Sequence, residues 1–77
     1  MKSVLVLGGG GFIGRNILEA LLARGDCLVT AADIKKGSNW DYLSKNSRTA
    51  SRFIPIIGDF SKIDSFKNLN NEFDEVY

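Results

Sequence analysis

The sequence lacks several residue types on which common enzyme sites depend. Among its 77 residues it has no histidine, one cysteine and one proline. Most zinc sites need histidine or several cysteines, so none is expected here. The sequence also lacks a G-x-S-x-G turn and a G-K-[ST] phosphate loop, which excludes most serine-hydrolase and NTPase sites. We therefore predict neither a metal site nor any of these catalytic centres.

Charge and hydrophobicity exclude two further classes of partner. The 10 basic and 9 acidic residues give a net charge of +1, which provides no basic surface for nucleic acid or anionic lipid. No apolar run approaches the roughly 20 residues that cross a bilayer, and the first residues form a strand pattern instead of a charged leader. The lone Cys27 cannot form an internal disulfide, so we expect it to be a small apolar core residue in a reducing compartment. These absences predict a cytoplasmic chain with no nucleic-acid or membrane partner.

Glycine is concentrated in residues 4–14 (VLVLGGGGFIG), where an apolar run leads directly into four successive glycines. Gly8 allows the chain to leave a strand in a tight turn, and Gly11 allows backbone N–H groups to approach a pyrophosphate. Gly14 allows the following helix to pack closely on the strand. The helix N-terminus provides a site for an anion. A strand, a glycine-rich turn and a helix in this order are typical of dinucleotide-binding proteins.

The segments around this turn alternate between helix and strand patterns. Apolar residues recur at helical spacing from Ile13 to Leu22 and Gly25 follows as a stop signal, which predicts a helix over 12–24. The polar connection 34–52 is expected to be irregular, apart from a short helix around Asp41–Asn46. This alternation predicts an α/β fold with a parallel sheet. Strands are expected over 2–7, 27–33 and 53–57, with a further helix over 61–70 and a fourth strand beginning near residue 74.

Asp33 ends the second expected strand, nineteen residues after Gly14. Dinucleotide-binding proteins place an acid at a spacing of about 20 residues, where it binds the adenosine ribose hydroxyls. Such an acid pairs with a free 2′-hydroxyl and repels a 2′-phosphate. Lys35 and Lys36 could instead accept a 2′-phosphate, but the acid makes NAD a better candidate than NADP.

The turn Gly8-x-x-Gly11-Phe12-Ile13-Gly14 resembles the extended short-chain dehydrogenase/reductase family, which includes NAD-dependent nucleotide-sugar epimerases and dehydratases. Leu7 and Gly10 stand where the family typically has threonine and alanine. The extra glycine adds backbone freedom, which predicts a looser turn than the family norm. Gly58-Asp59-Phe60 resembles the family's G-D-[LFV] element, whose acid accepts a hydrogen bond from the adenine amino group. Residues 73–77 are similar to the opening of the family's fourth strand.

This resemblance implies a partial Rossmann fold, with a parallel sheet of three to four strands in the order 3-2-1-4 flanked by helices. Residues 1–77 would then be the N-terminal part of an NAD(P)-binding domain, with no second domain. In a complete relative the implied reaction is reversible hydride transfer at a carbon of a nucleotide-linked sugar. The residues implied to contact the cofactor are Gly8, Gly11, Phe12, Ile13, Gly14, Asp33, Ile34, Lys35, Asp59 and Phe60.

The resemblance also implies a catalytic Tyr-x-x-x-Lys pair, which this sequence lacks. Residues 42–45 (YLSK) come nearest, but Lys45 is one position too early and the segment lies in the wrong connection. We expect a solvated surface stretch there, no catalytic residue, and a chain that binds cofactor without turning over a substrate. Two alternatives stay open: a non-catalytic dinucleotide-binding module, and the N-terminal half of a reductase acting on a non-sugar carbonyl such as a flavonoid or steroid.

The expected sheet has a fourth strand that is incomplete at Tyr77 and a far face without helices to cover it. A chain of this size can scarcely tolerate so much exposed apolar surface as a monomer. We therefore expect self-association, most simply as a two-fold dimer through uncovered sheet edges or faces.

Overall fold

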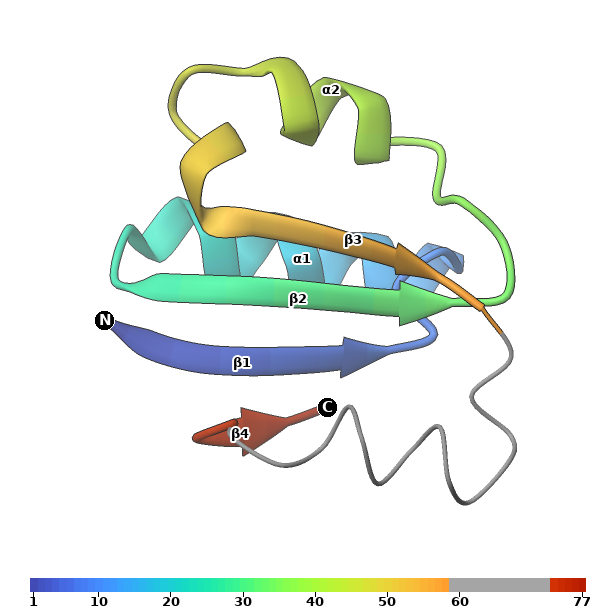
Figure 1. The fold of residues 1–77 in the computed structure, drawn as a ribbon, viewed down its shortest axis with the longest axis horizontal. Coiled ribbons are helices and arrows are strands. Elements are labelled where there is room, and N and C mark those ends of the chain that lie inside the picture. The colour runs from blue at the N-terminus through green and yellow to red at the C-terminus, as the bar shows by residue number, and fades with distance from the viewer. Residues whose placement is uncertain (59–72) are drawn as a thin grey trace.

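A sheet of four parallel strands runs through the computed structural model, which describes residues 1–58 and 73–77 (Figure 1). The strands lie in the order β3-β2-β1-β4, so the α/β class and the strand order 3-2-1-4 expected from the sequence are confirmed. Two helices and a 3-10 helix connect the first three strands. The elements are β1 (Lys2–Leu7), α1 (Phe12–Arg24), β2 (Cys27–Asp33), α2 (Trp40–Lys45), η1 (Ala50–Arg52), β3 (Phe53–Ile57) and β4 (Glu75–Val76).

Most of the expected elements have the bounds that the sequence predicted. The first three strands and α1 match residue for residue, and β4 begins one residue after position 74. The short helix in the polar connection is present as α2, displaced by one residue from the expected 41–46. The 3-10 helix η1 was not expected. The second helix expected over 61–70 lies outside the described residues, as do Asp59 and Phe60.

β1 lies in the interior of the sheet, between β2 and β4. Its register with β2 runs from Lys2 opposite Cys27 to Leu7 opposite Ala32, and Leu5 also lies opposite Val76 of β4. The chain therefore adds β2 and β3 on one side of β1 first, and adds β4 on the other side later. In parallel sheets the point where the strand order reverses, at the carboxyl ends of the strands, is where ligands bind.

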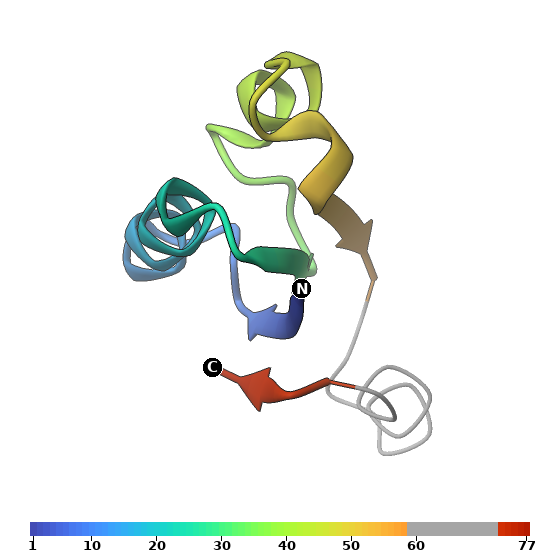
Figure 2. The ribbon, with the colours of Figure 1, turned by 90° about the vertical axis from the view of Figure 1, so that its left-hand side faces the viewer.

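The core lies on one face of the sheet, against α1 and α2 (Figure 2). Successive strand residues point to opposite faces, so alternate positions of β1 and β2 supply it. Cys27 is fully buried, which confirms it as a small core residue. The core residues are Val4, Val6, Leu18, Leu21, Leu22, Cys27, Val29, Ala31, Trp40, Leu43 and Phe53.

Ile13 departs from the expected apolar face of α1. Its side chain is 74% exposed, whereas Leu18, Leu21 and Leu22 are buried. The reason is that the first turn of α1 lies beside the glycine turn and not over the strands. Within the part of the chain that the structure describes, no helix is long and apolar enough to cross a membrane.

Candidate functional site

Residues 8–11 turn the chain from the carboxyl end of β1 into α1. Gly8 has a φ of +73°, a left-handed conformation that glycine adopts without steric cost. Its N–H donates to the carbonyl oxygen of Ala32 at 2.8 Å, and the N–H of Gly11 donates to the carbonyl oxygen of Gly8 at 3.1 Å. The backbone thus closes the turn on itself and joins it to the end of β2.

The N-terminus of α1 opens directly on this turn. Gly11 is its N-cap residue, it has no side chain to cap the helix, and the first turn carries no acidic residue. As is general for a first turn, the amides of Phe12, Ile13 and Gly14 have no carbonyl partner among the described residues. Together with the helix dipole, these N–H groups favour a bound anion.

Gly14 lets α1 lie close to the glycine turn. The sequence predicted that it would let the helix pack closely on the strand instead. A Cβ atom on Gly14 would overlap the carbonyl oxygen of Gly8 and lie 2.7 Å from the Cα atom of Gly9. A Cβ atom on Gly11, in contrast, would meet only the oxygen of Gly8, at an ordinary 3.6 Å. Space therefore exists beside Gly11 for a ligand to approach the backbone, while Gly14 is required for the turn itself.

Asp33 is half-buried at the end of β2, and its carboxylate accepts three backbone hydrogen bonds. Oδ2 accepts from the N–H of Gly10 at 2.8 Å, and Oδ1 accepts from the N–H groups of Ile34 and Lys35 at 2.6 and 3.4 Å. An ionised carboxylate has about four acceptor sites, so it can still accept a hydrogen bond from a ligand hydroxyl. The glycine turn and the acid at the end of β2 thus lie side by side.

Gly10 is packed closely against the connection that follows β2, and it does not have a positive φ. A Cβ atom on Gly10 would lie 2.5 Å from the carbonyl oxygen of Lys35 and 2.8 Å from Oδ2 of Asp33. The missing side chain lets the turn approach Asp33 closely enough for the hydrogen bond to form. Close packing is therefore what requires a glycine at this position, and the looseness of the turn stays a prediction.

The remaining expected contacts surround this site and are largely exposed. Phe12 is 79% exposed beside the turn, and Ile34 and Lys35 are exposed just after Asp33. Lys36 forms an ion pair with Asp41 at 2.5 Å, which directs it toward α2. Asp59 and Phe60 lie outside the described residues. The structure brings the others together at the carboxyl ends of β1 and β2: Gly8, Gly11, Phe12, Ile13, Gly14, Asp33, Ile34 and Lys35.

Trp40, the first residue of α2, was not expected at this site. Its side chain is 1% exposed, and its indole N–H donates to the carbonyl oxygen of Gly9 at 3.2 Å. The sequence offered one signal, since this is the only tryptophan in the chain and it stands in an otherwise polar connection. Nothing in the sequence indicated that it would contact the turn.

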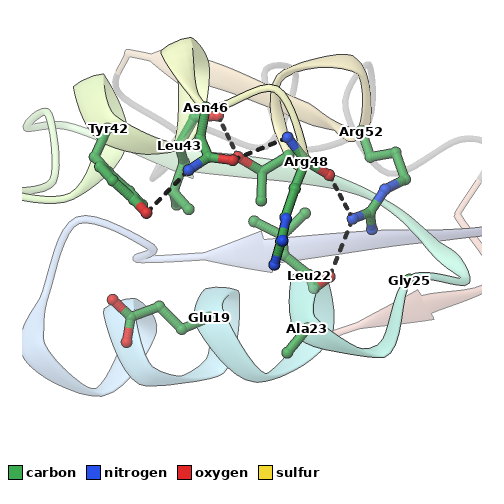
Figure 3. Close-up of a pocket in the computed structure, with 10 residues that line it drawn as sticks. Glu19, Leu22, Ala23, Gly25, Tyr42, Leu43, Asn46, Arg48 and Arg52 are labelled. Carbon is green, nitrogen blue, oxygen red and sulfur yellow. Dashed lines mark hydrogen bonds between the residues drawn. The ribbon is translucent and has the colours of Figure 1, made fainter.

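A separate pocket of about 460 Å³ lies between the second half of α1, α2 and η1 (Figure 3). None of the expected cofactor residues lines it. Arg52 donates from Nη2 to the carbonyl oxygens of Leu22 and Arg48 at 3.1 and 2.8 Å, and the hydroxyl of Thr49 donates to the carbonyl oxygen of Leu43 at 2.6 Å. These bonds join the helices around the pocket, so we assign its polar groups a structural role.

The segment 42–45 lies on α2, away from the glycine turn. Tyr42 is exposed, and its hydroxyl oxygen accepts a hydrogen bond from Nδ2 of Asn46 at 2.9 Å. Ser44 and Lys45 are also exposed, as expected of a solvated stretch, but Leu43 is buried in the core, so the expectation is wrong at that position. Within residues 1–58 and 73–77, no three histidine, cysteine, aspartate or glutamate residues cluster in a way that could hold a metal ion.

The chain is similar to a known family and to a solved structure. The sequence model of the 3-beta hydroxysteroid dehydrogenase/isomerase family matches residues 5–77. A solved structure, the terminal R domain from the myxalamid PKS-NRPS biosynthetic pathway, is similar with a TM-score of 0.69 and 26% sequence identity. The similarity covers 100% of this chain and 24% of that one, so the chain spans about a quarter of its length. No curated protein matches the chain.

Proposed function

Because this chain belongs to the 3-beta hydroxysteroid dehydrogenase/isomerase family, we propose that it is the cofactor-binding portion of a nicotinamide-dependent oxidoreductase. One observation carries the proposal: the N–H of Gly10 donates to Oδ2 of Asp33 at 2.8 Å. This bond joins an anion site at the N-terminus of α1 to an acceptor for hydroxyl groups. In this proposal residues 1–77 are the N-terminal part of a Rossmann domain, with no second domain among them.

The residues at the site fit a dinucleotide. The amides of Phe12, Ile13 and Gly14 would hold the pyrophosphate, because no acidic residue of the first turn opposes it and the space beside Gly11 is open. The carboxylate of Asp33 would accept a hydrogen bond from the adenosine ribose, since three of its about four acceptor sites are occupied. By the family resemblance, Asp59 and Phe60 would contact the adenine.

The same carboxylate favours NAD over NADP. A 2′-phosphate would place its negative charge against Asp33, whereas a free 2′-hydroxyl can donate a hydrogen bond to it. Lys36, which could otherwise neutralise a phosphate, is already paired with Asp41. Lys35 is exposed and its backbone N–H donates to Asp33, so a 2′-phosphate beside Lys35 would also lie near the acid. We therefore propose NAD as the cofactor.

The nicotinamide would supply hydride transfer, while the substrate would be held by parts of a longer protein that this chain does not contain. The first candidate is the nucleotide sugar implied by the sequence resemblance. The second is a non-sugar carbonyl or secondary alcohol such as a steroid, and the matched family favours it by its description. We propose the second, and the residues of this chain act by binding and orienting the cofactor.

Calorimetric titration of the full chain with ADP-ribose, NAD and NADP tests the proposal. We expect NAD to bind more tightly than NADP, and Asp33→Ala to reduce that preference by about tenfold or more by weakening NAD and relieving the repulsion of the 2′-phosphate. Asp26→Ala is the matched control, because Asp26 is an exposed acid that precedes β2 at its opposite end. Equal affinity of the unmodified chain for NAD and NADP would contradict the cofactor assignment, and no binding of ADP-ribose would contradict the function.

A further inference from the structure

Trp40 connects α2 to the glycine turn through its polar edge. The indole N–H donates to the carbonyl oxygen of Gly9 at 3.2 Å, and both groups are buried. A buried indole N–H needs an acceptor, and a buried carbonyl oxygen needs a donor, because either one left alone loses the hydrogen bonds that it makes to water in the unfolded chain. The hydrogen bond therefore fixes where the turn lies relative to α2.

The absence of a side chain at Gly37 makes this arrangement possible. A Cβ atom on Gly37 would lie 2.5 Å from Nε1 of Trp40 and 3.1 Å from the Cα atom of Gly10. Gly37 does not have a positive φ, so its conformation does not require glycine and the need for it is steric. A side chain at position 37 would thus point at the indole and the turn together, and the connection from β2 to α2 fits beside them because Gly37 has no side chain.

The turn and the connection after β2 are consequently joined at two places. Gly10 donates to Asp33 at the start of the connection, and Gly9 accepts from Trp40 at its end. The six residues between Asp33 and Trp40 are held at both ends against the turn. Trp40 also belongs to the core, where its ring meets Phe53 edge to face with centroids 6.1 Å apart, but that contact uses none of its polar edge.

We propose that Trp40 is a positioning residue that fixes the spacing between the anion site at α1 and the carboxylate of Asp33. The inference rests on the proposed function, since it concerns a ligand that spans both places. A ligand that bridges two sites binds well only when their spacing is set before it arrives. A ligand that uses Asp33 alone does not depend on that spacing.

Two variants and one control test this role. Trp40→Phe keeps an aromatic ring and removes the N–H donor, and Gly37→Ala keeps the indole and displaces it from Gly9. Leu43→Val is the control. Leu43 is also buried on α2, but its side chain is a hydrocarbon and makes no hydrogen bond to the turn. We expect all three to lower the unfolding temperature, and only the first two to change the site.

The first measurement is amide hydrogen exchange of the full chain without ligand. We expect the amide of Gly10, which donates to Asp33, to exchange about tenfold faster in Trp40→Phe and Gly37→Ala than in Leu43→Val, while the amide of Leu5 in the interior strand reports the global loss of stability of each variant. Because no ligand is present, this result is independent of the proposed function. Unchanged exchange of Gly10 in both variants, relative to Leu43→Val, would overturn the proposal.

The second measurement compares ADP-ribose with adenosine by NMR titration. We expect Trp40→Phe to weaken ADP-ribose, which spans both sites, by about tenfold and adenosine by less than about twofold. Equal losses for the two ligands, or the same losses in Leu43→Val, would overturn the positioning role while leaving the proposed function intact. An unmodified chain that binds neither ligand would contradict the proposed function, and the exchange result would then decide whether Trp40 fixes the turn.

Discussion

The carbonyl group of Gly8 lies so close to Gly14 that a side chain at Gly14 would overlap it, whereas a Cβ atom on Gly11 would meet the same carbonyl oxygen at an ordinary 3.6 Å. We therefore expect Gly14→Val to destabilise the fold by about 1–3 kcal/mol or more, since the turn must shift to admit the side chain. Gly11→Val should cost less than about 1 kcal/mol, because Gly11 has an extended conformation that valine also adopts.

In ligand binding the order should be reversed, with Gly11→Val as the variant that loses affinity. The side chain of Gly11→Val would occupy the space beside the first-turn amides, so ADP-ribose affinity should fall by about tenfold or more. Urea unfolding and calorimetric titration of both variants measure the two effects. Equal loss of stability in both, with ADP-ribose affinity kept, would show that the anion site lies elsewhere.

Arg52 should stabilise the structure more than its partial exposure suggests. Its guanidinium donates to the carbonyl oxygens of Leu22, Arg48 and Cys27, at 3.1, 2.8 and 3.4 Å. Charge-assisted bonds of this kind contribute about 1.5–3 kcal/mol in favourable cases. We expect Arg52→Ala to lower the unfolding free energy by about 1–3 kcal/mol.

Two further variants define the role of Arg52. Arg52→Lys should recover only part of the loss, because an ammonium group cannot reach three carbonyls in the planar geometry of a guanidinium. Arg24→Gln is the control, since Arg24 pairs with Asp26 at the surface and should change stability by less than about 0.5 kcal/mol. A loss for Arg52→Ala as small as that of the control would refute the stabilising role.

The docking of β4 should depend on pH through Glu75. Hydrogen bonds from Lys2 and then from the hydroxyl of Tyr77, both at 2.6 Å, hold the pKa of Glu75 below its ordinary value of 4.5. The folded state therefore favours the carboxylate, and this contribution is present above pH 4.5 and is lost as the pH falls through the lowered pKa. NMR titration of the Glu75 carboxyl should give a midpoint below 4.5, and Lys2→Gln should raise it. A midpoint that does not move in Lys2→Gln would contradict the pairing.

Self-association stays a prediction, and exposed apolar side chains lie on the two edge strands of the sheet. The expectation of a bare far face is wrong in the middle of the face away from α1, because Leu5 and Thr30 are buried there side by side. Ile54 and Val76 flank them with 43% and 44% of their surface exposed. Exposed apolar groups at both sheet edges favour contact with a second copy. Light scattering across a dilution series should show a dimer that dissociates on dilution, and Ile54→Lys should weaken it. A monomer at all concentrations would contradict the expectation.

The bounds of the strands and of α1 followed from the sequence because local patterns determine them. Gly8 and Gly25, which both have positive φ, mark the end of β1 and the end of α1, and alternating or helical apolar spacing fills the segments between. Asp33 was located by its distance along the chain from the glycine turn. Its role as a ribose acceptor is still a prediction, but its place beside the turn is a finding.

Contacts between segments could not be predicted in the same way. The proximity of Gly10 to Lys35, of Trp40 to Gly9 and of Arg52 to Leu22 depends on how the elements pack, and no local pattern encodes it. Gly10 shows the consequence most clearly. The sequence alone suggested that this glycine is a source of backbone freedom. The structure shows that a side chain is excluded because the connection after β2 packs against the turn.

The place of β1 between β2 and β4 has a consequence for the order in which the chain folds. The pairing of β1 with β2 closes a loop through α1, while the backbone bond from Asp74 to Ser3 joins residues 71 positions apart. Closing the longer loop costs more chain entropy and slows the contacts that depend on it. The half of the sheet that carries the glycine turn and Asp33 should therefore form first, and β4 should add to an edge of β1 that is already in place.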